Sequence, residues 1–490
     1  MTAYDALLAF TRDTHALAEV LGRLSWDQET VMPRGAAPQR AEEMAALEKV
    51  LHGRRSDPRV GEWLAAAEPS DDVARAQIRL IRRAYDRAMK VPVDLASEIA
   101  RVTSLSQGIW AEARAADDVA AFLPTLAQVV DLARAEAAAL ADGGDPYDAL
   151  LDGHEPGMSG AAIAALFDSL RPGLVDLRQR ILGSGRDMAI LQGPFDEAAQ
   201  LRLTTECARA FGYDLDRGRI DKAVHPFSSG SGLDVRITTR TSPDEIFGCL
   251  YSTIHETGHG CYEQGIDRAY LLTPLGTGVS MGVHESQSRI YENQLGRSRA
   301  FAGWLHGRCV EAFGDMGVAG ADAFYGAMNR VEAGYIRTEA DEVHYNLHIM
   351  LRFDLERALI RGALEVADLE AAWNDRFKAD FGVAVDRPSN GVLQDVHWPV
   401  GLFGYFPTYT LGNVYAGCLF EALQRDVPEW EPALATGDAG PATGWLRERV
   451  QQYGGLYEAP ALIAQATGAA VSAQPLLRYL ETKFADLYDL

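Results

Sequence analysis

Cysteine is scarce in this sequence, and its few copies form no pattern. Five cysteines occur in 490 residues, an odd number, and no two are spaced as CxxC. Such usage excludes a disulfide framework of the kind found in small secreted domains and favours a reducing compartment. We therefore expect a cytoplasmic protein, and we interpret Cys261, which lies near a motif described below, as a packing residue.

Long apolar runs and a leader are also missing. No apolar run approaches the roughly 18 residues that a membrane-spanning helix needs. The N-terminal residues 1–5 (MTAYD) are not a basic region followed by an apolar stretch, so no signal peptide is expected. The sequence thus predicts no association with a membrane.

Positive charge is in deficit. The chain has 46 lysines and arginines and 69 aspartates and glutamates, so its formal net charge is 46 − 69 = −23. A nucleic-acid footprint requires a basic patch or stripe, so this balance argues against nucleic acid as a partner. The hydrophobic share of 47% and the charged share of 23% are ordinary for a globular protein.

Against these absences stands one motif with clear chemistry, the HExxH pentapeptide at residues 255–259. Ser242 and the Pro and Glu that follow it predict a helix start, and Gly265 predicts its end. On such a helix His255 and His259 lie one turn apart on the same face and can share one zinc ion. Glu256 lies beside them, where it can take a proton from a water at that metal.

Zinc in a catalytic site needs a third protein ligand and one open position. One variant of the motif places a further histidine six residues after the pair, but a glycine stands there. We therefore expect the third ligand to be Glu285, 26 residues beyond His259 (285 − 259), on a second helix that Ser280 caps. Glu263 and Glu292 are competing candidates, and we interpret both as residues of solvated helix faces.

A short β-region is predicted directly before the zinc helix. Apolar and polar residues alternate in 222–227 and 233–240, and a Ser/Gly-rich turn joins the two runs, which predicts a hairpin. Its edge could pair with an extended peptide. Asp234 and Arg236 share one face of the second run. They form either a surface ion pair or contacts with a substrate.

The rest of the chain has helical periodicity. We predict a mostly α protein, a single large helical body with a deep central groove and a small β-sheet beside the zinc helix. All of 1–490 forms one peptidase domain. Its parts are an N-terminal helical part (1–215), the hairpin region (216–242), and the zinc-site helices with the C-terminal helical part (243–490).

Two later segments carry further candidates. Arg337 lies in an acidic stretch. It is either a structural arginine paired with an acid or the receptor for a substrate carboxylate, since the geometry of a guanidinium matches that of a carboxylate. His344 and His348 are four apart but lack the glutamate of the first pair, so we interpret them as core histidines rather than a second metal site. Residues 391–412 are rich in Gly, Pro and aromatics and predict an ordered loop. A histidine and tyrosines there can stabilise an oxyanion or simply pack.

Together these segments resemble the carboxypeptidase Taq family of zinc metallocarboxypeptidases. The resemblance covers the chain nearly end to end and shows no departure in the metal motifs. The matching motifs are Trp26–Gly35, His225–Phe227, Asp234–Thr238, His255–His259, His284–Ser288, Ile336–Asp341 and Gly391–Trp398 with its continuation to Tyr409.

The resemblance implies a deep-grooved helical fold related to other gluzincins, removal of single residues from free peptide C-termini with broad specificity, and a homodimer. It implies one zinc per chain, with cobalt or manganese able to substitute. The implied metal ligands are His255, His259 and Glu285, with Glu256 as general base. The implied substrate-site residues are His225, Asp234, Arg236, Arg337, Gln394 and His397, and we expect His397 or Tyr409 to donate to the oxyanion.

Two rival functions remain open. An oligoendopeptidase or a dipeptidyl carboxypeptidase on a similar helical body would use the same zinc ligands. A non-catalytic peptide-binding protein with a structural zinc is disfavoured, because a closed structural site needs four protein ligands and the motif offers three.

Overall fold

Helices make up most of the regular structure, as the periodicity predicts, and a small sheet interrupts them. The computed structural model describes residues 2–490. It divides into two compact units, each assembled from separate stretches of chain. Unit 1 comprises the chain up to Ala88, Met188–Asn329 and Cys418–Ala470; unit 2 comprises Met89–Asp187, Arg330–Gly417 and Val471–Leu490. These units do not follow the sequence-ordered parts predicted above, and the single peptidase domain stays a prediction.

The bounds of the elements are as follows. Unit 1 contains α1 (Ala3–Thr30), α2 (Ala37–Arg55), α3 (Pro58–Ala66), α9 (Glu197–Ala210), β1 (Gly218–Lys222), β2 (Ser228–Ser231), β3 (Asp234–Thr239), α10 (Phe247–Gly265), α11 (Met281–Arg289), α12 (Arg299–Phe313), α13 (Ala321–Met328), α17 (Trp430–Leu434), α18 (Gly440–Arg449) and α19 (Ala459–Thr467). Unit 2 contains α5 (Val93–Ala116), α6 (Val119–Leu140), α7 (Pro146–Leu151), α8 (Gly160–Gly183), α14 (Glu342–Ile360), α15 (Leu369–Phe381) and α20 (Gln474–Tyr488). Two helices, α4 (Asp72–Lys90) and α16 (Pro407–Asp426), contribute residues to both units.

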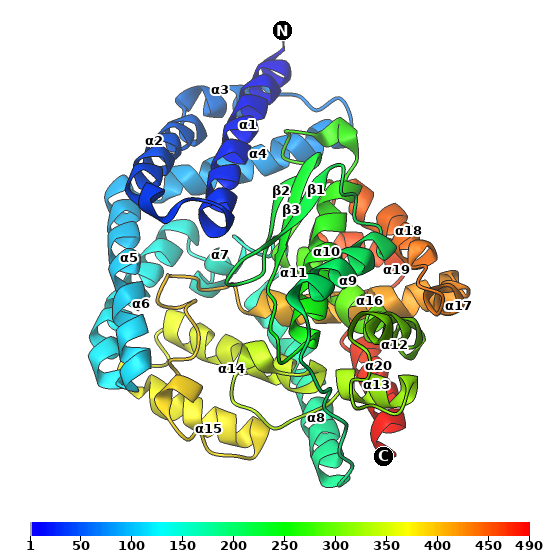
Figure 1. The fold of residues 1–490 in the computed structure, drawn as a ribbon. Helices are drawn as coiled ribbons and strands as arrows, with labels where there is room; N and C mark the ends of the chain where they lie inside the picture. The colour runs from blue at the N-terminus through cyan, green and yellow to red at the C-terminus, as the bar shows by residue number, and fades with distance from the viewer. Residues whose placement is uncertain (1) are drawn as a thin grey trace. The chain divides into compact units, whose positions relative to one another are not determined.

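The sheet of unit 1 has three strands in the order β1-β3-β2 and lies beside α10 (Figure 1). β1 is parallel to β3, with Ile220 opposite Ile237, and β2 is antiparallel to β3. Val235 and Ile237 are fully buried, whereas Asp234 and Arg236 are half-buried, which confirms the alternation predicted for this strand.

The first arm of the predicted hairpin is wrong. Residues 223–227 form a loop, and the Ser/Gly-rich stretch predicted as the turn is itself strand β2. β1 ends at Lys222 because its partner strand β3 ends opposite it, at Thr239. The turn is shifted to Gly232, whose φ of 60° suits a residue without a Cβ.

The metal-motif helix α10 begins at Phe247, five residues after the predicted cap, and ends at Gly265 as predicted. The Ser242 hydroxyl instead accepts from the Asp244 N–H, and the Glu245 carboxylate accepts from the Gly248 N–H at 2.7 Å. A polar residue thus still supports the first turn, but it is the glutamate rather than the serine.

α11 packs directly on α10, with one glycine at the contact. A Cβ on Gly258 would lie 2.5 Å from the Gln287 carbonyl oxygen and 2.6 Å from Ser288 Cα. Only a glycine inside the HExxH motif therefore permits this approach. Ser280 caps α11 as predicted, accepting from the Val283 N–H at 3.1 Å. The chain continues as a π-helical turn, Ile290–Leu295, a feature frequent at functional sites.

In unit 2 the central element is α14, which is buried along nearly its whole length and packs on α6, α8 and α15. Four polar side chains recur along it at intervals of four residues, and therefore on one face: His344, His348, Arg352 and Glu356. Each is at most 1% exposed, so each requires a partner inside the fold.

The interpretation of His344 and His348 as core residues is confirmed. His344 Nδ1 lies 2.7 Å from Asp341 and its Nε2 accepts from Arg178 Nε at 3.0 Å. His348 packs among the rings of Phe377 and Phe381. Within residues 2–490, metal-ligating side chains gather in threes only at the HExxH helix. None of the helices described is long and apolar enough to cross a membrane.

Candidate metal centre and active site

The predicted ligands His255, His259 and Glu285 come together in unit 1. Glu285 Oε2 lies 3.7 Å from His255 Nε2 and 3.5 Å from His259 Nε2, and one ligand atom from each residue falls within 4.8 Å of the others. A tetrahedral zinc site with bonds of about 2.0–2.1 Å places its ligand atoms roughly 3.3–3.4 Å apart. Two imidazole nitrogens and one carboxylate at this spacing fit a divalent cation with an open fourth position.

The protonation of two of the three groups suits ligation. At the third, His255, burial opposes a charge on the ring, but the carboxylates of Glu285 and Glu292 outweigh it and raise the pKa, so a cation that binds there displaces a proton. Burial lowers the pKa of His259 to about 3, which keeps its ring neutral. Burial opposes ionisation of Glu285, but the nearby charges of Arg289 and His255 hold the pKa of its carboxyl well below the usual range. Arg289 Nε donates to Glu285 Oε1 at 2.7 Å, so Oε1 is engaged and Oε2 is turned to the histidines.

A further set of groups fixes the ligand rings from behind. His255 Nδ1 lies 2.9 Å from Glu292 Oε2. His259 Nδ1 lies 2.6 Å from His284 Nδ1, and His284 Nε2 lies 2.9 Å from Glu263 Oε1. If His255 and His259 bind the metal through Nε2, each ring carries its proton on Nδ1. These two N–H groups then donate hydrogen bonds to Glu292 and to His284 Nδ1.

The solvated positions predicted for Glu263 and Glu292 are therefore wrong. Glu263 is 6% exposed, and Glu292 is a half-buried partner of a ligand ring that also lies near Arg289 and Arg297. Glu263 follows His259 by four residues, which puts the two on one face of α10. That spacing was the sequence signal for its role.

Replacing either supporting group should weaken metal binding without removing a ligand. For Glu292→Gln and His284→Ala we expect affinity for Zn²⁺ to fall about 10–100-fold, because the ring of His255 loses the negative charge of its acceptor and the ring of His259 loses its acceptor altogether. Competition with a chromophoric chelator measures this directly. Glu311→Gln, an exposed residue of α12, is the matched control. Unchanged affinity in both variants would show that these contacts do not support the centre.

Glu256 is buried beside the ligands, as the motif predicts. Its side chain is 6% exposed, and its Oε2 atom has no hydrogen-bond partner in the described part of the chain. Burial raises the pKa of Glu256 to about 7. A carboxyl group in this state can hold or release a proton near neutral pH, which a general base requires.

The sheet residues form a compact ion-pair cluster. Asp234 accepts from Arg236 Nε at 2.7 Å and Nη2 at 2.9 Å, and from Arg23 Nε at 2.8 Å. The hydrogen bonds from Arg236 contribute most to lowering the pKa of Asp234 to about 2. The Arg236 guanidinium stacks on Trp26 at 4.3 Å from the ring centre. The ion pair, one of the two alternatives left open above, is present in the structure, and a contact of these residues with substrate stays a prediction. His225 lies exposed in the β1–β2 loop.

Unit 2 gathers the remaining predicted residues around an aspartate that sequence reasoning missed. Asp395 Oδ1 accepts from Arg337 Nε at 3.1 Å and Nη2 at 2.9 Å. Gln394 Oε1 accepts from the Arg337 backbone N–H at 3.0 Å, so Gln394 holds the main chain. His397 Nε2 lies 3.2 Å from the Tyr409 hydroxyl. The sequence does indicate Asp395, because it is an acidic residue between the predicted site residues Gln394 and His397 in an aromatic loop.

Glu356 anchors the loop that carries these residues. Tyr147 Oη donates to its Oε1 at 2.5 Å, Trp398 Nε1 donates to its Oε2 at 3.1 Å, and the Gly404 backbone N–H also bonds to the carboxyl. Burial nevertheless outweighs these donors and raises the pKa of Glu356 to about 8. The loop is thus tied to α14 through a carboxyl that keeps its proton at neutral pH.

This raised pKa predicts a pH-dependent stability. The protonated Glu356 carboxyl contributes its full stabilisation below pH 4.5, which is about its pKa in the unfolded chain. This contribution is lost as the pH rises through about 8, the pKa in the folded protein, because between the two values the carboxyl ionises in the unfolded chain but not in the folded one. Glu356→Gln cannot ionise. The melting temperature of the variant minus that of the wild type should therefore increase by about a few degrees between pH 5 and pH 9. A difference that stays constant across this range would contradict the assignment.

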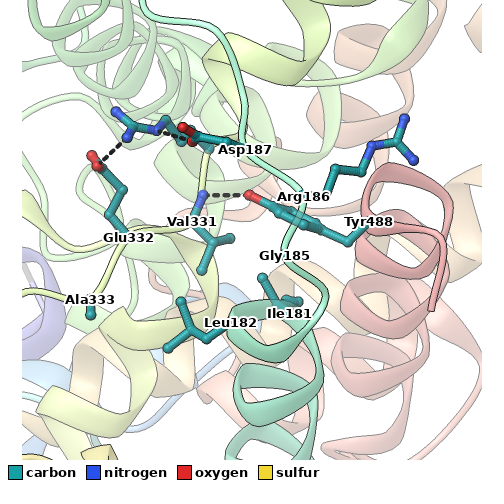
Figure 2. A pocket seen from close by; sticks show the side chains of 10 residues that line it. Ile181, Leu182, Gly185, Arg186, Asp187, Val331, Glu332, Ala333 and Tyr488 are labelled. Atoms are coloured by element: carbon teal, nitrogen blue, oxygen red, sulfur yellow. Dashed lines mark hydrogen bonds and ion pairs between the residues drawn. The ribbon is translucent and has the colours of Figure 1, made fainter.

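A separate surface cavity of about 310 Å³ lies in unit 2, between the end of α8, the segment 330–333 and Tyr488. Figure 2 shows the Val331 N–H donating to the Tyr488 hydroxyl, at 2.9 Å. Arg330 is paired with Glu332 at 2.6 Å and lies 3.6 Å from Asp187. The cavity contains none of the predicted site residues.

Comparisons with known proteins agree on one family. The model of the Carboxypeptidase Taq (M32) metallopeptidase family matches residues 6–484. Thermostable carboxypeptidase 1 of Thermus thermophilus is 45% identical over 504 residues, covering 99% of both chains, and Carboxypeptidase 1 of Bacillus subtilis is 33% identical, covering 96% of both. The crystal structure of the M32 carboxypeptidase from Deinococcus radiodurans R1 superposes with a TM-score of 0.95 at 37% identity and covers 100% of both chains.

Proposed function

Because the chain belongs to the carboxypeptidase Taq (M32) metallopeptidase family, we propose that it is a zinc-dependent carboxypeptidase that removes single residues from free peptide C-termini with broad specificity. The observation that carries this proposal is the convergence of His255, His259 and Glu285 at ligand spacing, with buried Glu256 beside them. Use of cobalt or manganese, the homodimer and the cytoplasmic location remain predictions.

The proposed chemistry assigns the proton transfers to Glu256. When bound, zinc would supply a Lewis acid that polarises the scissile carbonyl and makes water acidic. Glu256 takes the proton of the attacking water and then gives it to the leaving amine. The buried Oε2 atom of Glu256 supports this role because it has no hydrogen-bond partner in the described part of the chain, and a base must have an oxygen that is not already hydrogen-bonded.

We assign recognition of the terminal carboxylate to Arg337 rather than Arg236. The Arg236 fork is occupied by Asp234 through Nε and Nη2. What distinguishes Arg337 is its neighbourhood, because its guanidinium carbon lies 5.3 Å from the centre of the Tyr409 ring. It engages Asp395 through the same two atoms, and its Nη1 contacts the Tyr345 hydroxyl at a long 3.5 Å. A charge-assisted bond to a carboxylate would replace this weak contact at little cost.

His397 and Tyr409 are proposed as donors to the oxyanion that develops on the scissile carbonyl. Their 3.2 Å contact joins the two side chains, so the loss of either one alters the position of the other. We expect Tyr409→Phe and His397→Ala each to lower kcat by about 100-fold or more, with the double variant little worse than either one. Steady-state kinetics on one peptide tests this, and unaltered kcat in both single variants would remove the pair from the mechanism.

The cleavage mode is tested by the products. An eight-residue peptide with eight different residues is incubated with the zinc-loaded protein and followed by mass spectrometry. We expect a ladder in which each product is shorter by one C-terminal residue. Losses of two residues at a time would indicate a dipeptidyl carboxypeptidase, and internal fragments would indicate an oligoendopeptidase; either would overturn the proposal.

A further inference from the structure

Two arginines share one aspartate in unit 2. Asp395 Oδ1 is bound by Arg337, and Asp395 Oδ2 lies 2.6 Å from Arg352 Nε and 2.6 Å from Arg352 Nη2. Arg352 is 0% exposed, its guanidinium stacks on Trp373 at 4.6 Å, and its Nη1 donates to the His348 carbonyl at 2.7 Å. Arg352 therefore lies entirely inside the fold, where no substrate can touch it.

The charges of this cluster do not cancel. Burial lowers the pKa of Arg352 to about 10, so it stays protonated at neutral pH, and the charge of Asp395 keeps the pKa of Arg337 above its ordinary value despite burial. The two arginines hold Asp395 ionised. Burial lowers the pKa of His397 to about 4, so its ring is neutral. Two cations and one anion leave a net charge of +1 in a largely dry environment.

A buried net positive charge is unfavourable in free energy unless an anion compensates it. In a low-dielectric interior, charges interact over distances well beyond contact. If Asp395 faced Arg337 alone, the pair would be neutral and would attract a carboxylate weakly. Because Arg352 takes up the second oxygen of Asp395, the positive charge of Arg337 is only partly compensated, and its Nη1 atom is not bound to the aspartate.

We propose that Arg352 determines the preference for a free C-terminal carboxylate without touching the substrate, by sharing Asp395 and leaving the Arg337 receptor with a net positive charge. The inference rests on the proposed function, in which Arg337 receives that carboxylate. Asp395 and Arg352 are thus positioning residues. The alternative is that Arg352 only supports the fold, as buried ion pairs often do.

The test compares Arg352→Met with Arg352→Lys, since both are long and only lysine keeps the charge. The control is Arg171→Met, because Arg171 is a largely buried arginine of unit 2, with its side chain 11% exposed, that also bridges two aspartates, Asp354 and Asp380, at 2.6 Å each. For each protein kcat/KM is measured on a peptide acid and on its C-terminal amide. The ratio of the two values reports carboxylate recognition and is insensitive to a general loss of active protein.

We expect Arg352→Met to reduce the acid-to-amide ratio by about tenfold or more, with kcat/KM for the amide nearly unchanged, and Arg352→Lys and Arg171→Met to keep the wild-type ratio. If Arg352→Met does not fold, Arg352→Gln, which keeps a donor to Asp395 without the charge, takes its place. A wild-type ratio in the uncharged variant would overturn the inference alone. A wild-type enzyme that cleaves acid and amide equally would overturn both the proposed function and this inference.

Discussion

Replacing Glu256 with glutamine is expected to lower kcat by about 10²–10⁴-fold while the metal stays bound. Glutamine keeps the size of the side chain but cannot accept the proton of the attacking water. Because Glu256 is not among the three ligand residues, metal affinity should stay within a few-fold of the wild type. The loss should therefore fall on kcat rather than on KM.

Two measurements on the same preparation separate this outcome from its rivals. Elemental analysis gives the zinc content, and initial rates with a peptide acid give kcat. A metal-free Glu256→Gln protein would mean that Glu256 supports the centre rather than the chemistry. Full activity with metal bound would exclude it as the base.

Glu285→Gln should show the largest effect on the metal itself. The substitution keeps the shape of the side chain but removes the charge of the one anionic ligand, whose Oε2 lies 3.5 Å and 3.7 Å from the two histidine nitrogens. We expect zinc affinity to fall by more than about 100-fold, beyond the upper end for groups that only orient a ligand. Activity should vanish at stoichiometric zinc.

The order of effects is the sharper check. Chelator competition should rank the glutamate variants as Glu285→Gln, then Glu292→Gln, then the exposed control Glu311→Gln, from the weakest zinc binding to the strongest. Recovery of Glu285→Gln activity by excess zinc would support loss of affinity as its cause. If Glu285→Gln bound zinc as tightly as Glu292→Gln does, Glu285 would be a residue that orients the ligands and not a ligand itself.

The proximity of the three candidate metal ligands could be predicted from sequence, in part because local periodicity relates the two histidines. Spacings of four residues place His255 and His259 on one helical face in any helix, and a capped second helix limits where Glu285 can fall. The close contact that brings the helices together depends on Gly258, whose role needs coordinates, since its Cβ position is blocked by backbone atoms of α11.

Other features could not be read from local pattern. The pairing of Glu292 with His255 joins residues 37 apart and lies in a π-helical turn, where ordinary helical spacing does not apply. Strand β2 has a Ser/Gly composition typical of a turn and is a strand only because β3 offers it a ladder. Asp395 has a distinct role only because Arg337 and Arg352 reach it from elsewhere in the chain.

The proposed enzyme hydrolyses the last peptide bond of its substrate and requires a free carboxylate to do so. The most direct measurement is kcat/KM of the zinc-loaded wild-type enzyme on a peptide acid and on the otherwise identical C-terminal amide. We predict efficient removal of single residues from the acid and at least about 100-fold slower cleavage of the amide, because an uncharged amide does not compensate the positive charge at Arg337. Equal cleavage of both peptides would contradict it.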